Sequence, residues 1–237
     1  MVSSMDMTMN ATNYTTKRLL NIKDPGSALT HFIGMLLAII AAFPLLIRAS
    51  HQQGLVYPIS MTVFISSMIL LYGASTTYHT LNISPRINRI LKKVDHMMIF
   101  ILIAGSYTPI CTIALNNSGG TLLLALVWSI AIGGILVKAL WITCPKWFSS
   151  VLYIAMGWLC VFSFRQIIAA LPTPAFWWLL IGGILYTVGG VIYAIRFRGF
   201  NTRHPYFGTH EIFHLFVMAG SFCHFIVMYQ YVVFMPM

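Results

Sequence analysis

The sequence predicts an all-α integral membrane protein built as a bundle of seven transmembrane helices. Of its 237 residues, 59% are hydrophobic and only 8% are charged, and the mean hydropathy is +0.83. A soluble domain carries about 25% charged residues. The apolar residues also gather into seven runs of about 20 residues, the length that an α-helix needs to cross the hydrocarbon core.

Helix-breaking residues separate these runs and set the expected limits of the spans. Asp24-Pro25 is typical of a helix start, with proline at the first helical position. The runs N-N-S-G-G at 116–120 and Pro172-Thr-Pro174 mark two of the turns. The expected spans are residues 27–47, 56–81, 94–115, 120–141, 149–170, 176–196 and 209–234.

The chain divides into two unequal parts. Residues 1–24 are expected to form a polar cytoplasmic N-terminal segment, because they lack the short apolar core of a signal peptide. Residues 25–237 are expected to form one seven-span membrane domain. Inside it, the glycine pairs at 133–134, 182–183 and 189–190 predict places where neighbouring helices approach closely.

The basic residues indicate how the bundle is oriented. The formal net charge is +10, which raises nucleic-acid binding as a function. However, the lysines and arginines lie in short gaps between apolar runs and form no continuous phosphate-binding stripe, which argues against it. All of them except Arg48 and Arg165 fall on one side of the predicted membrane. The positive-inside rule therefore places the N-terminus in the cytoplasm and the C-terminus outside.

A small set of polar residues lies within the apolar runs. Ser75 and His79 fall in the last turns expected for the second span, and Asp95 in the first turn expected for the third. His210 and His214 fall in the first two turns of the seventh span. Both pairs have i,i+4 spacing, which puts the two members on one helix face. The predicted topology brings all five residues to the same depth, just inside the cytoplasmic boundary.

Three imidazoles and a carboxylate at one depth indicate a zinc site with an open position. A catalytic zinc takes three protein ligands and a water molecule, whose pKa falls to about 7. The expected ligands are His79, His210 and His214. Asp95 is then the candidate general base, and Ser75 can orient the water or donate to an oxyanion. His31, at the start of the first span, is expected to support a ligand from behind.

Simpler interpretations stay open at this point. Histidines spaced i,i+4 occur in many helices, Asp95 could cap its helix or pair with Lys92 or Arg89, and Ser75 could be a small packing residue. The shared depth of the five residues favours the metal site, since polar groups in membrane spans are costly. Other histidines are interpreted as ordinary interhelical hydrogen-bonding residues, namely His96, His204 and His224.

The order of these motifs resembles the hemolysin III family. That family forms one superfamily of seven-span proteins with the progestin and adiponectin receptors and the alkaline ceramidases. The likeness covers nearly the whole chain from Asp24 onward. The most specific stretches are G-A-S-T-T-Y-H (73–79), K-K-V-D-H (92–96), I-A-G-S-Y-T-P (103–109), A-M-G-W (155–158) and G-T-H-E-I-F-H (208–214).

The resemblance implies roles for particular residues. The zinc ligands of the superfamily correspond to His79, His210 and His214, with Ser75 and Asp95 beside the metal-bound water. The family usually has a glutamate seven residues before the histidine of its first span. Here that position is Asp24, a shorter acid, which is a second candidate for supporting the site from behind.

Three functions remain to be compared. The preferred one is a zinc-dependent hydrolase of a lipid amide or ester, acting at the cytoplasmic face of a bacterial plasma membrane with membrane lipids as partners. The ceramidase branch hydrolyses an amide, which supports this choice. The alternative is a non-catalytic membrane sensor with a structural zinc. A pore-forming haemolysin ranks lower, because an aqueous channel needs polar stripes and the third to sixth spans carry almost no charge.

Overall fold

The computed structural model describes residues 22–116, 118–195, 197–204 and 207–236, and these residues contain helices and turns but no strand. Most of the expected segment 1–24 lies outside this part of the chain. The elements are α2 Pro25–Ser50, α3 Val56–Thr80, α4 Pro85–Pro109, η1 Ile110–Ala114, α5 Gly120–Leu140, α6 Lys146–Gly157, η2 Trp158–Ser163, α7 Phe164–Ala170, α8 Thr173–Ile195, α9 Arg198–Arg203, α10 Thr209–Gln230 and η3 Val232–Phe234.

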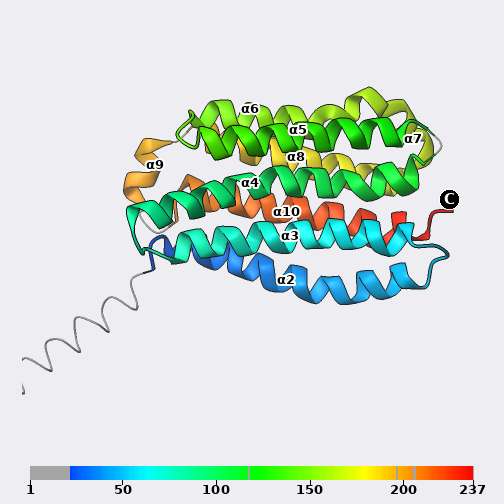
Figure 1. Cartoon of the computed structure of the whole chain (residues 1–237), viewed down its shortest axis with the longest axis horizontal. Helices are drawn as coiled ribbons and strands as arrows, with labels where there is room; N and C mark the ends of the chain where they lie inside the picture. The colour runs from blue at the N-terminus through cyan, green and yellow to red at the C-terminus, as the bar shows by residue number, and fades with distance from the viewer. Residues whose placement is uncertain (1–21, 117, 196, 205–206, 237) are drawn as a thin grey trace, which may run out of the picture.

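The predicted seven-span architecture is confirmed in the described residues. Seven helical segments are long and apolar enough to cross a membrane, and each matches one expected span. They lie side by side, with α9 and the start of α2 at one end of the bundle and the C-terminus at the other (Figure 1). Large apolar side chains such as Leu37, Ile40 and Phe43 are exposed on the outer surface. Lipid tails are the solvent that such a surface requires.

The third span starts earlier than expected, and this moves Asp95. α4 begins at Pro85, where the Ser84 hydroxyl accepts a hydrogen bond from the Ile87 amide at 3.3 Å. Hydropathy misses this start because the first turns carry four basic residues. Asp95 therefore lies in the third turn of α4, not the first, so it does not cap the helix. Its carboxylate lies 3.2 Å from Nδ1 of His96, so its close side-chain partner is His96 and not Lys92 or Arg89.

The fifth span is interrupted by a tyrosine from the third. The Tyr107 hydroxyl donates a hydrogen bond to the Gly157 carbonyl at 2.7 Å and accepts one from the Cys160 amide at 2.9 Å. It thereby takes partners that a regular α-helix would join to its own backbone, and the chain follows a 3₁₀ path through η2. A side chain inserted into the hydrogen-bond ladder is a known cause of such breaks.

In two of the three glycine pairs, 133–134 and 182–183, only one member lies close to a neighbouring helix. A Cβ at Gly134 would overlap the ring of Phe100, whereas a Cβ at Gly133 would meet nothing within 4 Å. Phe100 is buried and packs edge-on against Tyr153, with 4.8 Å between ring centroids. The ring therefore has little room to move away, and Gly134 is the residue that lets α5 approach α4.

We expect Gly134→Ala to lower the free energy of unfolding by about 1–3 kcal/mol, because it overpacks a filled core. Gly133→Ala is the matched control and should be neutral or slightly stabilising, since alanine is the better helix former. Thermal unfolding of both variants in one detergent measures the difference. Equal melting temperatures would contradict the packing described for this helix pair.

Candidate metal centre

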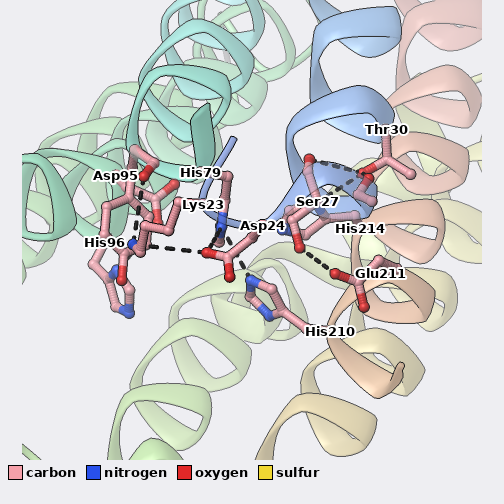
Figure 2. Close-up of polar contacts among 12 residues, drawn as sticks. Lys23, Asp24, Ser27, Thr30, His79, Asp95, His96, His210, Glu211 and His214 are labelled. Atoms are coloured by element: carbon pink, nitrogen blue, oxygen red, sulfur yellow. Dashed lines mark hydrogen bonds and ion pairs between the residues drawn. The ribbon is translucent and has the colours of Figure 1, made fainter. Parts of the chain in front are cut away.

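Three histidines meet at the end of the bundle that carries α9. His79 lies in the last turn of α3, and His210 and His214 lie in the first two turns of α10. One ring nitrogen from each falls within 4.8 Å of the other two. Figure 2 shows these side chains converging from two helices, with the start of α2 beside them. The structure therefore brings the three predicted ligands close enough to hold one metal ion.

Asp24 orients His79. Its carboxylate lies 2.9 Å from Nδ1 of His79, and its backbone amide donates to the His79 carbonyl, also at 2.9 Å. A carboxylate only accepts, so Nδ1 carries the hydrogen and Nε2 presents its lone pair. The hydrogen bond from His79 holds the pKa of Asp24 below its usual value. Asp24 thus lies where a residue supporting the site from behind was expected.

Thr30 orients His214 by the same logic. Its hydroxyl oxygen lies 3.0 Å from Nδ1 of His214 and 3.0 Å from each of two backbone carbonyl oxygens, those of Gly26 and Ser27. A hydroxyl has one hydrogen, and carbonyls only accept, so that hydrogen points to a carbonyl. With the hydrogen directed to a carbonyl, the Thr30 oxygen accepts from Nδ1 of His214, in the tautomer that is protonated there. This again leaves Nε2 as the free nitrogen.

The donor set fits a zinc ion. Nε2 of His79 lies 3.2 Å from Nε2 of His210. Two nitrogens bound to one tetrahedral zinc at about 2.0–2.1 Å are separated by about 3.3 Å, so the rings of His79 and His210 already have the required spacing. Nδ1 of His210 is buried without a hydrogen-bond partner. Three imidazoles with two of their tautomers fixed by neighbours are the arrangement that metal-binding histidines usually show.

Three further predicted residues lie beside the histidines. Ser75 and Asp95 are buried and line the same cavity as His210 and His214. His31 stacks on the ring of His214, with centroids 3.5 Å apart and planes 8° apart. Neither nitrogen of His31 has a hydrogen-bond partner, and the Ser75 hydroxyl has none either. His31 therefore contacts His214 through its ring, while Asp95 and Ser75 contribute polar groups to the wall of the cavity.

The histidines lie at the head of an elongated cavity of about 180 Å³. Its lining begins at Asp95 and His210 and reaches Phe176 and His224. His210 and His224 are 14 residues apart on α10, which is about 21 Å along the helix axis. Aliphatic and aromatic side chains form most of the wall between them. This shape suits a long apolar ligand whose polar end lies at the histidines.

Two contacts at the centre were not predicted from the sequence. One is Thr30 to His214, and the other joins the Ser27 hydroxyl to the Glu211 carboxylate, which also accepts from the Gly208 amide. The sequence does contain a pattern that indicates these two contacts. Asp24, Ser27 and Thr30 recur every three residues, which is a polar stripe on one face of an otherwise apolar helix.

Comparisons with known proteins point to one family. The family described as haemolysin-III related matches residues 20–225. Hemolysin-3 of Bacillus cereus is 38% identical over 195 residues, which cover 82% of this chain and 85% of the relative. The Hemolysin-3 homolog of Bacillus subtilis (strain 168) is 37% identical over 210 residues, covering 89% and 94%. The Adiponectin receptor protein of Drosophila melanogaster is 27% identical over 85% of this chain and 49% of that relative.

We expect Thr30→Val to weaken zinc binding by roughly 10- to 100-fold, the usual effect of removing an outer partner of a metal ligand. Valine keeps the shape of threonine but removes the hydroxyl oxygen that lies 3.0 Å from Nδ1 of His214. Thr30→Ser keeps the hydroxyl and should bind zinc like the wild type. Competition with a chromogenic zinc chelator gives both affinities. If Thr30→Val and Thr30→Ser bind zinc alike, the hydroxyl does not orient His214.

Proposed function

The chain belongs to the haemolysin-III-related family and is a multi-pass protein of the bacterial plasma membrane. On that premise, we propose that it is a zinc-dependent hydrolase of a lipid amide or ester. One observation carries the proposal. Three histidine nitrogens converge at the head of an apolar cavity, and a buried carboxylate and hydroxyl line the same space.

The residues around the centre support a division of roles. Zinc held by His79, His210 and His214 would polarise a carbonyl and lower the pKa of a water molecule. We assign the proton-accepting role to Asp95, because its carboxylate lines the same cavity as His210 and His214. Ser75 supplies a hydroxyl that has no protein partner and can hydrogen-bond a substrate oxygen.

The cavity supports a lipid substrate. Its wall between the two ends is largely apolar and lies within a bundle whose outer surface is apolar as well. An acyl chain can enter such a space without leaving a hydrocarbon environment, whereas an aqueous path would need polar walls along its length. The lining therefore favours a lipid hydrolase over a pore-forming haemolysin.

The location of the centre in the membrane is part of the proposal. The end of the bundle that holds the histidines also carries Lys23, Lys92 and Lys146, whereas Arg48 lies at the opposite end. The positive-inside rule assigns the lysine-rich end to the cytoplasm. The proposed reaction therefore takes place at the inner leaflet, with the substrate headgroup at the cytoplasmic boundary.

We expect His79→Ala and His210→Ala each to lower the zinc content of the purified protein at least about tenfold, because a site with two protein ligands binds zinc weakly. The exposed His204 provides the control, and His204→Ala should keep the wild-type zinc content. Elemental analysis after identical purification measures all three. Unchanged zinc stoichiometry in both ligand variants would rule out this centre.

We expect Asp95→Asn to keep its zinc but to lose lipid hydrolysis by roughly 100- to 10,000-fold, the usual contribution of a general base. The amide matches the carboxylate in shape but cannot accept a proton. Release of a labelled acyl chain from N-acyl and O-acyl lipids, assayed beside the wild type, tests this. A zinc-loaded Asp95→Asn protein with full biological function would instead indicate a sensor with a structural zinc.

A further inference from the structure

A polar residue lies at the far end of the cavity, deep inside the bundle. His224 is the sixteenth of the 22 residues of α10, so it lies in the interior of a membrane span. It lines the cavity together with Trp158, Phe164 and Phe176, which are all apolar or nearly so. An ionisable side chain at such a depth is expensive, and its presence points to a function.

The position of the His224 ring is well defined. It lies edge-on against Tyr186, with 5.2 Å between ring centroids and planes 81° apart. A Cβ at Gly182 would overlap the ring, so the missing side chain at Gly182 is what lets α8 accommodate it. The sequence therefore provides a fitted slot for this imidazole between α8 and α10.

The hydrogen-bonding groups nearby do not satisfy His224. The Ser221 hydroxyl forms hydrogen bonds with the hydroxyls of Tyr72 and Tyr186, at 2.7 Å and 2.8 Å, and not with His224. The ring of His224 faces the Leu179 carbonyl, but neither of its nitrogens makes a hydrogen bond of normal geometry to any described residue. A buried donor and a buried acceptor without hydrogen-bond partners destabilise the fold unless a ligand forms hydrogen bonds with them.

The distance between His224 and the histidines of the metal centre sets the position on a bound ligand of the group that hydrogen-bonds His224. His224 is 10 residues from His214 and 14 from His210, which is about 15–21 Å along α10. One leaflet contributes about half of the 30 Å hydrocarbon core, so an extended acyl chain of ordinary length reaches about 15 Å. A lipid whose headgroup lies at the three histidines would therefore bring the last part of its chain to His224.

We propose that His224 binds an oxygen near the methyl end of an acyl chain, so that the cavity selects lipids with an ω- or subterminally hydroxylated chain. A neutral imidazole has one donor and one acceptor, and so has a hydroxyl group. The apolar wall between the two ends accepts the methylene chain. The inference rests on the proposed function only in placing the polar end of the lipid at the three histidines.

The test uses binding of free fatty acids to the purified full-length protein in detergent. Displacement of radiolabelled palmitic acid is measured with palmitic, α-hydroxypalmitic and ω-hydroxypalmitic acid. The wild type should bind the ω-hydroxy acid roughly tenfold more tightly than the other two, the effect of one added hydrogen bond. His224→Phe should remove this preference while still binding palmitic acid. His204→Phe is the matched control and should keep the preference.

A second measurement needs no ligand. Phenylalanine fills the same slot without buried polar atoms, so His224→Phe should raise the melting temperature by about 2–4 °C. A lower melting temperature would show that His224 has a structural partner and would overturn the inference. Equal binding of the three acids by the wild type would overturn it too, as would a preference that survives in His224→Phe. Zinc content of the same samples reports on the proposed function separately.

Discussion

The structure depends on how buried imidazoles are satisfied inside an apolar bundle. A histidine in a membrane span has two ring nitrogens, and each needs a partner because no water is at hand. At His79 and His214 the outer nitrogen is held by a residue at the start of the first span, Asp24 or Thr30. The inner nitrogens of the three histidines lie within 4.8 Å of one another, and a cation shared among them would satisfy all three.

This constraint explains why the first span matters although it contributes no ligand. α2 packs against α3 and α10, the two helices that carry the histidines. Its polar stripe contacts both, and Ser27 also joins Glu211 at the start of α10. Apart from these contacts, α2 presents mostly apolar side chains to its surroundings. The helix therefore fixes the relative position of α3 and α10, and with it the spacing of the ligands.

Much of this architecture could be predicted from the sequence, because hydropathy and loop charge act over whole segments. The seven spans and the approach of His79 to His210 follow from such averages. The start of α4 does not, since the Ser84 cap and Pro85 outweigh four charged residues that lower the local hydropathy. Nor does the break at η2, because Tyr107 comes from a different span and only the packed structure brings it to Gly157. The partners of individual ring nitrogens are likewise a product of packing.

The central claim is that three imidazoles, and no other protein groups, hold one zinc ion at the head of the cavity. X-ray absorption at the zinc edge of the purified protein tests this most directly. The account predicts three nitrogen ligands at about 2.0–2.1 Å with the remaining place taken by oxygen. A sulfur ligand at about 2.3 Å would contradict it, because the metal-binding group formed by the described residues consists of histidines and includes none of the four free cysteines. So would a protein that retains no zinc.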